Sequence, residues 1–322
     1  MHNSYSLTRY SALVVVAMQP HYGSGALILI LNYNGAEETI PCVRSLLSDP
    51  EIDIEQIIVI DNASTDDSVA TIKESFPGIA VFRNDKNLGF AEGYNRAILE
   101  FLGTGRNCFF ILNNDTLVRP GTMSALLETL SGEKDVGIVG PAVLNMNTTV
   151  IHSVGFSIDF SRGRTVCHSN GLDYEFLELA ERDVECVCGC AMLISRDVFE
   201  RTGLFPSHFG FFSEEADLCL RARKQGFRIR CNPKGIVEHK SGSTTARFPE
   251  VRARLSIRNQ LLLTKRHGTI VQLVSYSIWL FVLEIPFLSI KDCGQHRKLS
   301  MTISRLMGAI DGLRMLTREP RL

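Results

Sequence analysis

The sequence predicts an α/β fold built on a doubly wound, mostly parallel sheet. Three observations predict it. Apolar runs of strand length alternate with helical patterns, the links between them are short, and two of the runs end abruptly in acids and amides. Runs that are apolar throughout are typical of strands buried on both faces. Open sheets of this kind bind ligands at the carboxyl ends of their strands, so acids placed there indicate a site.

The first part of the chain reads as four strands separated by helices. The predicted strands are 26–31, 56–60, 80–83 and 108–112. The predicted helices span 37–48, follow the capping residues 64–67, and run from 87 to about 102. Turn residues 32–35 close the first strand, and Pro120 stands near the start of the next helix, where its missing N–H costs nothing.

The pattern is looser after Val136. The predicted strands are 136–143, 151–160, 186–194, 227–230 and 236–237. A helix is predicted from Ser213 to Gln225, ended by Gly226, and the chain reads as mostly helical from Pro249 onward. We therefore expect an extension over 1–24, an α/β domain over 25–260 with halves 25–118 and 119–260, and a helical C-terminal region over 261–322.

Composition favours an ordinary globular protein. A net charge of −1 gives no global signature of nucleic-acid binding. The nine cysteines fit neither a disulfide scaffold nor paired zinc ligands, which favours free thiols in a reducing cytoplasm. Cys186, Cys188 and Cys190 alternate, so on a strand they would share one face.

The region from Leu218 to Gly268 is basic: it contains 13 Lys and Arg residues but only two acids, Glu238 and Glu250. Such a region suggests an anionic partner, either a phosphate-bearing substrate or a lipid surface. A solvated helix face is the alternative.

The segment from Thr269 to Ile290 is apolar over most of its length but contains Gln272, Glu284 and Pro286. It is long enough to span a membrane, although a carboxylate in its middle weakens that interpretation. Flanking basic residues suit an interfacial helix on anionic lipid. Surface docking, a packed core helix and a true span all stay open.

Two strand ends carry the acids that point to a ligand. Asp115 follows the run 109–112 and two asparagines, and Asp61 directly follows the strand 57–60. A carboxylate in this position can hold a divalent cation, and such a cation can neutralise a diphosphate. The sequence therefore suggests a nucleoside-diphosphate site.

Five blocks of sequence resemble a known family. They are LNYNG at 31–35, VIDNASTDDS at 59–68, NLGFAEGYN at 87–95, FILNNDT at 110–116, and CGCAMLISRDVFERTGLF with SEEADLCLRARKQGF within 188–227. In order and spacing they resemble the inverting family-2 glycosyltransferases with a GT-A fold, in the rhamnosyltransferase-like group. The resemblance covers about residues 26–260 and implies the GT-A sheet for the α/β domain.

The resemblance implies roles for the residues at the strand ends. The donor nucleotide would contact Asn34, Asp61, Asn62, Asp66, Asn87, Gly89, Asn113 and Asn114. The metal, Mg²⁺ or Mn²⁺, would be held by Asp115, with His239 as a second ligand or diphosphate contact. An amide, Asn113, replaces the first acid of the usual Asp-x-Asp-like motif. Asp66 as a helix cap, the asparagines as turn formers and His239 as a loop histidine are the plain alternatives.

The resemblance also implies a catalytic base in the block 214–217. The family's second acid corresponds to Glu215, where an Asp is usual, and Glu214 or Asp217 could share the role. Acids in a first helical turn are also favoured by the helix dipole alone. Gly189 and Cys190 would lie under the donor sugar or acceptor, although packing could equally require small residues there.

The implied reaction is transfer of a sugar, with inversion, from a nucleotide-diphosphate sugar to a hydroxyl of a saccharide or polyprenyl-diphosphate-linked acceptor. The resemblance favours dTDP-L-rhamnose or a UDP-sugar as donor, in cell-surface polysaccharide biosynthesis at the inner face of the cytoplasmic membrane. A catalytically silent scaffold in a polysaccharide-assembly complex is one alternative. A nucleotidyltransferase is another, but no Gly-rich phosphate loop follows the first strand.

Overall fold

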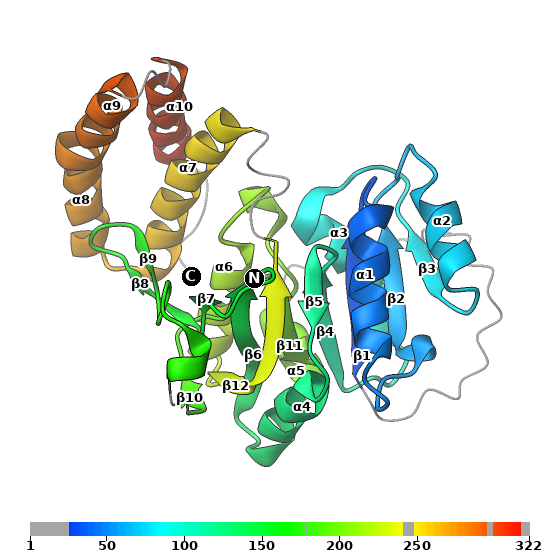
Figure 1. Cartoon of the computed structure of the whole chain (residues 1–322). Coiled ribbons are helices and arrows are strands. Elements are labelled where there is room, and N and C mark those ends of the chain that lie inside the picture. The colour runs from blue at the N-terminus through cyan, green and yellow to red at the C-terminus, as the bar shows by residue number, and fades with distance from the viewer. Residues whose placement is uncertain (1–25, 178–179, 241–247, 295–298, 317–322) are drawn as a thin grey trace.

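The computed structural model describes residues 26–177, 180–240, 248–294 and 299–316, so the predicted extension 1–24 lies outside the described residues. A single large sheet forms the centre of the molecule, and a group of C-terminal helices stands to one side of it (Figure 1). The strand order is β10-β12-β6-β11-β4-β1-β2-β3, with β5 on β12 and β7 on β6.

The first half matches the predicted alternation closely. Its elements are β1 (Leu27–Asn32), α1 (Ala36–Leu47), β2 (Ile57–Asp61), α2 (Ser68–Ser75), β3 (Ala80–Arg83), α3 (Gly89–Leu102) and β4 (Cys108–Asn113). Strands β3, β2, β1 and β4 are parallel neighbours. The predicted α/β sheet with the GT-A arrangement is confirmed as a mixed sheet, in which these four strands form the parallel part.

The second half adds one reversed strand inside the sheet. Its elements are β5 (Thr116–Val118), α4 (Thr122–Gly132), β6 (Val136–Asn145), β7 (Ile151–Ser153), β8 (Phe156–Asp159), β9 (Arg164–Cys167), β10 (Arg182–Asp183), β11 (Ala191–Ser195), α5 (Arg196–Thr202), α6 (Glu214–Lys224) and β12 (Arg228–His239). Strand β11 runs antiparallel to both β4 and β6, whereas β12 is parallel to β6.

Four predicted strands in this half were wrong in extent. The segment 151–160 divides at Gly155, whose φ of +90° bends the chain between β7 and β8. The segments 227–230 and 236–237 form one strand, β12, because pairing with β6 resumes after a bulge between Asn232 and Ile236. Strands β5, β9 and β10 were not predicted.

The fourth of these strands, predicted over 186–194, contains the alternating cysteines. Strand β11 begins only at Ala191, after a turn in which the Ala191 N–H donates to the Cys188 carbonyl. Cys186 forms an isolated bridge with Phe156 instead. The three thiols therefore do not line one strand, although the Sγ atoms of Cys188 and Cys190 lie 3.5 Å apart across the turn. Eight described cysteines are free.

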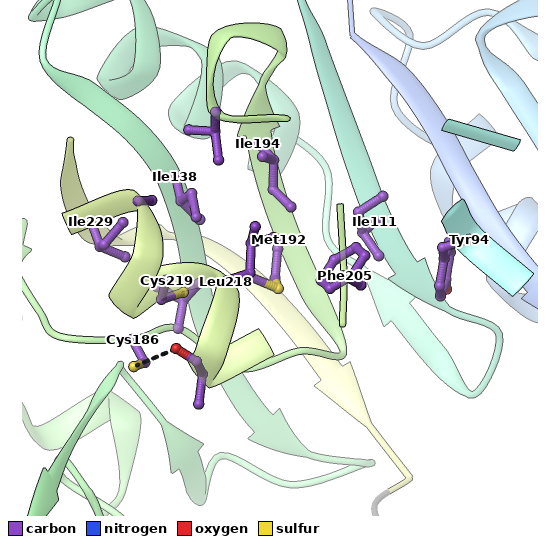
Figure 2. Packing of buried hydrophobic residues seen from close by; sticks show 14 of the residues in the cluster. Tyr94, Ile111, Ile138, Cys186, Met192, Ile194, Phe205, Leu218, Cys219 and Ile229 are labelled. Carbon is purple, nitrogen blue, oxygen red and sulfur yellow. Dashed lines mark hydrogen bonds between the residues drawn. The ribbon is translucent and has the colours of Figure 1, made fainter. Parts of the chain in front are cut away.

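Side chains of alternate residues on each central strand enter two separate cores. Ile28 and Ile30 pack with α1, α2 and α4, whereas Leu27 and Leu29 pack with α3, α5 and α6. Burial on both faces explains why the strands are apolar throughout. Figure 2 shows the second core beneath α6, with Met192 and Ile138 from the sheet close to Leu218 and Cys219 from the helix.

The C-terminal region is helical, as predicted, with α7 (Pro249–His267), α8 (Ile270–Trp279), a π-helical turn (Leu280–Glu284), α9 (Ile285–Gly294) and α10 (Leu299–Leu316). Helix α10 crosses α7 closely because Gly308 and Gly312 carry no side chain. A Cβ at either position would overlap α7. The β8–β9 hairpin supports α8, where the Ser275 hydroxyl donates to the Ser161 carbonyl.

Most of the basic region is neutralised by acids from other parts of the chain, so it is not a free cationic surface. Seven of the 13 basic side chains form ion pairs with acids outside 218–268. They are Arg221, Arg223, Arg228, Arg230, Lys240, Arg254 and Arg266. The expectation of an anionic partner at this region, drawn from the local count alone, is therefore not supported for these residues.

Candidate active site

The register of the parallel strands brings the predicted donor-site residues to one edge of the sheet. Asn32 at the end of β1 is level with Asp61 of β2, and Leu31 is level with Asn113 of β4. The turns that follow these strands therefore lie side by side, at the carboxyl ends where open α/β sheets bind ligands.

Asp115 and His239 meet at this edge although 123 residues separate them in the sequence numbering. Strand β5 pairs with the end of β12, which sets His239 opposite Thr116. The His239 Nε2 atom lies 3.2 Å from the Asp115 Oδ1 atom, and both side chains are almost covered. Burial lowers the pKa of His239, but the hydrogen bond and charge of Asp115 outweigh it, so the net pKa is raised.

The pair suits a divalent cation that also binds a ligand. One carboxylate and one imidazole supply an oxygen and a nitrogen, and Mg²⁺ and Mn²⁺ commonly complete their shells with waters and substrate phosphates. The described residues contain no cluster of three or more His, Cys, Asp or Glu side chains arranged as metal ligands. A dedicated all-protein metal cage is therefore not formed among them.

Asn34 joins the first strand's turn to the loop after β2. Its backbone is left-handed, with φ of 48°, its side chain exchanges hydrogen bonds with Thr65, and its N–H donates to the Ser64 hydroxyl. Asp66 lies on the same loop and is exposed. Its Oδ1 accepts from the Ser68 N–H at the start of α2, and the Ser68 hydroxyl, together with this N–H, lowers its pKa. The N-cap of α2 is Asp67, so Asp66 is not the helix cap that the alternative interpretation expected.

Asp61 is fully buried where it stands. Its Oδ1 accepts from the Ser64 N–H, and its Oδ2 lies 3.2 Å from Arg83 Nε without hydrogen-bond geometry. Oδ2 therefore keeps acceptor capacity, but a nucleotide can reach it only if Arg83 or the loop above it moves. Arg83 was not predicted as a site residue, because its position on a short edge strand carries no motif.

Three predicted donor residues hold the neighbouring loop together. Asn62 donates to the Asn87 side chain and the Gly89 carbonyl and accepts from Asn84 and Leu88. Asn87 also accepts from the Gly89 N–H. The hydrogen-bonding groups of the Asn62 side chain are therefore all occupied within the loop, whereas the Asn87 side chain is exposed. Gly89, with φ of +72°, faces the Gly210 carbonyl, and a Cβ there would stand 3.7 Å from that oxygen.

The two asparagines before Asp115 have different surroundings. The Asn114 amide donates to the Thr39 hydroxyl and lies against Gly35, where a Cβ would come within 2.8 Å of it. The Asn113 backbone N–H donates to the Cys190 carbonyl, and its side chain is half-buried. Asn114 therefore supports the turn, and contact of Asn113 with the donor stays a prediction.

Glu214 and Glu215 begin helix α6 and both have raised pKa values. Burial, with the neighbouring Glu215 charge, raises the pKa of Glu214 to about 8, and its Oε1 has no hydrogen-bond partner. Burial raises the pKa of Glu215 to about 7. Glu215 is only half-buried, whereas Glu214 is covered. Glu215 therefore combines a base's pKa near neutrality with access to solvent.

Gly189 lies directly against Glu215. A Cβ at Gly189 would come within 3.2 Å of the Glu215 Cβ and Cγ atoms, so a larger residue there would push the glutamate by a few tenths of an ångström. Beside it, Cys190 is buried, and the Cys188 thiol contacts Cys190 and lies next to His152. His152 in turn packs edge-on against His239. The turn 188–190 thus connects the acid pair to the Asp115 and His239 pair.

The buried, positively charged surroundings of Asp217 do not suit a catalytic base. It is completely buried, Oδ1 accepts from Arg266 Nε and lies 2.8 Å from His267 Nε2, and Oδ2 accepts from Arg221 Nε. Burial raises its pKa, but these partners outweigh that effect and hold the pKa well below the ordinary value. Asp217 is an anchor between α6 and α7.

Sequence reasoning missed His152, Arg258 and Asn259. Asn259 and Arg258 contact the loop that precedes Glu214, and His152 packs beside His239. None of them lies within a block that carried a motif, and only the folded chain brings them to the acids. An Arg-Asn pair on an otherwise amphipathic helix, with the Asn on the apolar side, was the available signal.

Comparisons with known proteins identify the family and the fold. The model of the family described as "Glycosyl transferase family 2" matches residues 27–203. N-acetylglucosaminyl-diphospho-decaprenol L-rhamnosyltransferase of Mycobacterium tuberculosis is 25% identical over 211 residues, covering 60% of this chain and 69% of the relative. The low-salt glycan biosynthesis hexosyltransferase Agl10 of Haloferax volcanii is 23% identical over 298 residues, covering 91% of this chain and 92% of the relative.

Two solved structures share the fold. The Pyrobaculum calidifontis mannosyltransferase, in complex with GDP-Man and Mn²⁺, superposes with a TM-score of 0.56 at 15% identity, covering 93% of this chain and 90% of that one. Residues 1–349 of TarS from S. aureus superpose with a TM-score of 0.55 at 11% identity, covering 91% and 81%. At these identities the likeness describes the fold alone.

Proposed function

Because the chain belongs to glycosyltransferase family 2 and has the mixed sheet of the GT-A fold, we propose that it is an inverting, metal-dependent hexosyltransferase. It transfers a sugar from a nucleotide-diphosphate donor to a hydroxyl of a saccharide or lipid-linked saccharide in cell-surface glycan biosynthesis. The rhamnosyltransferase relative favours dTDP-L-rhamnose, with a UDP-sugar as the other leading donor. The observation that carries the proposal is the Asp115 and His239 pair at the strand ends, joined through the turn 188–190 to Glu215.

In this proposal different side chains of the protein perform different parts of the transfer reaction. Asp115 and His239 would hold Mg²⁺ or Mn²⁺, and the bound cation would supply positive charge beside the departing diphosphate. Glu215 takes the proton of the acceptor hydroxyl while that oxygen bonds to the anomeric carbon. The bond from the anomeric carbon to the diphosphate oxygen breaks on the opposite face, and the nucleoside diphosphate leaves with the electron pair. One displacement therefore inverts the anomeric centre.

The environment of the two acids supports this division. Glu214 is covered and has a pKa of about 8, so at neutral pH it is protonated and neutral. Glu215 titrates near pH 7 and is the one that reaches solvent. Of the candidates in this block, Glu215 is thus the acid that is both ionisable at neutral pH and accessible to an acceptor.

The acceptor side is proposed from the C-terminal helices. One helical stretch in the described chain, Ile270–Lys291, is long and apolar enough to cross a membrane, with mean hydropathy 1.8, yet only 17% of it is buried. This low burial argues against a packed core helix over 269–290 and supports surface docking or a span. Exposed apolar side chains also occur on α10, and the set includes Val271, Val274, Ile278, Val282, Phe287, Ile303 and Ile310. Glu284 is half-buried, with Arg164 and Arg305 nearby, so it does not interrupt this face.

We place this apolar face, formed by the exposed residues of α8, α9 and α10, on the inner surface of the cytoplasmic membrane. A membrane-bound acceptor such as a polyprenyl-diphosphate saccharide would then meet the site at the lipid surface. Amphipathic helices bind membranes in proportion to the apolar area that they bury.

Charged substitutions on this face test the membrane assignment. We expect Val271→Asp with Phe287→Asp to reduce binding to phosphatidylglycerol-containing vesicles about tenfold or more, because each Asp opposes burial in lipid. Both positions are highly exposed, so folding should be unaffected. Phe176→Asp, at an exposed position of the α/β domain, is the control. Equal vesicle sedimentation of wild type and double variant would contradict peripheral docking.

A nucleotide panel tests the donor site. We expect dTDP or UDP with Mn²⁺, at about 100 times its dissociation constant, to stabilise the wild type by roughly 2.7 kcal/mol in a thermal-shift assay. Asp115→Asn should remove the metal-dependent part of the shift and lower kcat about 100-fold, because the diphosphate loses its counter-charge. Asp66→Asn, at the same edge of the sheet but outside the metal pair, is the control, because any loss of nucleotide affinity there should be the same with and without Mn²⁺.

A catalytically silent scaffold remains the second candidate, motivated by Asn113 in place of an acid and by Glu215 in place of Asp. The two functions predict different results in one assay. A metal-dependent nucleotide shift together with sugar-nucleotide turnover supports the enzyme, and the absence of any nucleotide shift supports the scaffold.

A further inference from the structure

Helix α7 reaches the loop that presents the catalytic acids. The amide nitrogen of Asn259 lies 3.1, 2.7 and 2.8 Å from the carbonyl oxygens of Phe209, Phe211 and Phe212. Arg258, the preceding residue, also donates to the Phe209 carbonyl. Glu214 and Glu215 follow this loop after a single residue, so Asn259 acts on the backbone directly before the acids.

The loop needs such support. Gly210, Phe212 and Ser213 all have left-handed φ values, of 73°, 71° and 75°. Two of them carry side chains that disfavour this region, and such conformations persist only where the surroundings hold them. Ser213 is also the residue from which α6 begins, so its conformation sets the direction in which Glu214 and Glu215 leave the helix end.

Among the described residues, the Asn259 side chain forms no hydrogen bond other than those with this loop and with Arg258. It is completely buried, and its Oδ1 accepts only from the neighbouring Arg258 Nε. A buried amide on the apolar side of a helix costs free energy unless its donors are used. Here the donors all serve one loop.

A second set of contacts holds the same two helices farther along. Arg266 and His267, two turns after Asn259 on α7, bind Asp217 of α6. Helix α6 is thus tied to α7 both at its first turn and through the loop before it. The family match ends at residue 203, so this support comes from a part of the chain outside the matched region.

We propose that Asn259, assisted by Arg258, is a positioning residue that sets the geometry of Glu215 through the 209–213 loop. The proposal rests on the proposed function. It makes the C-terminal helical region a working part of the catalytic unit as well as the carrier of the apolar face.

The test compares Asn259→Ala and Asn259→Asp with Gln260→Ala. The Asp variant keeps the shape of the side chain but removes its donors. Gln260 is the next residue on α7, and its only described bond is to the Thr165 hydroxyl. In both Asn259 variants we expect kcat, normalised to nucleotide-binding sites, to fall about 30- to 100-fold, with donor KM within about twofold of wild type.

Two further readouts separate positioning from a general loss of structure. The acidic limb of the pH profile should move to lower pH, because an opened loop lets water solvate Glu215 and lowers its pKa. Amide hydrogen exchange should rise over 209–217 but not over 27–113. Gln260→Ala should match the wild type in all of these measurements.

Three results would overturn the inference. They are a normalised kcat within about threefold of wild type, turnover and nucleotide binding lost in parallel, and exchange over 209–217 unchanged in Asn259→Ala. The exchange measurement needs no substrate. If the wild type transferred no sugar from any donor, the proposed function would fail, while the exchange comparison would still decide whether Asn259 holds the loop.

Discussion

Glu215→Gln is expected to lower kcat for sugar transfer about 10³- to 10⁴-fold while leaving nucleotide binding intact, because removal of a general base leaves the acceptor proton without a destination. The change is nearly isosteric, and Glu215 is half-buried at the start of α6, so the fold should be unaffected. Rates with a saturating donor and nucleotide affinity by calorimetry are the two measurements.

Glu214→Gln is the matched control. With a pKa of about 8, Glu214 is mostly protonated at neutral pH, and a glutamine is the closest neutral mimic of that form. Its kcat should stay within about fivefold of wild type, since general-base catalysis does not pass through it. If the two variants exchanged these outcomes, Glu214 would be the base.

The pH dependence has a definite sign. The base must be ionised, and burial raises the pKa of Glu215 to about 7. Activity should therefore fall as the pH drops below about 7, with a single proton taken up, and this limb should be absent from the residual rate of Glu215→Gln. A limb near pH 4.5, the ordinary range for a glutamate, would contradict the buried environment described for this residue.

Asp217→Asn is expected to lower the free energy of unfolding by about 3–5 kcal/mol, because it leaves buried cations without their counter-charge. Asp217 is wholly covered and meets Arg221, Arg266 and His267. Urea unfolding at pH 7 measures the effect. The control is Asp311→Asn, which breaks the more exposed pair with Arg254 on α7 and should cost under about 1 kcal/mol.

The sign of the pH effect follows from the pKa of Asp217, which is lower in the folded chain than in the unfolded one. Its contribution to stability is therefore fully present above the unfolded pKa and is lost as the pH falls below it toward the folded value. The stability difference between wild type and Asp217→Asn should narrow on acidification. If the variant were as stable as the wild type but had no turnover, Asp217 would instead have a catalytic role.

The blocks that carried the family resemblance are local in sequence, and local patterns could be interpreted correctly. Runs of consecutive apolar residues, separated by helical segments, predicted the first four strands to within a residue or two. Strands buried on both faces admit few polar residues. The acids at the ends of β2 and β4 were likewise visible, since nothing in strand packing requires an acid there. The division of the chain at Gly155 and the bulge between Asn232 and Ile236 could not be predicted from the sequence. Pairing across a bulge depends on the partner strand.

The sequence by itself determined the fold class, the family and the set of chemically capable residues. Only the tertiary structure decided how those residues divide their tasks. Glu214, Glu215 and Asp217 are acids within one helical turn, and their spacing cannot separate them. Burial without a partner raises the pKa of the first, Gly189 leaves space for the second, and Arg221 and Arg266 neutralise the third, which His267 also contacts. Each of these causes comes from a distant part of the chain, and electrostatic and steric effects act through space, so they exist only once the chain is folded.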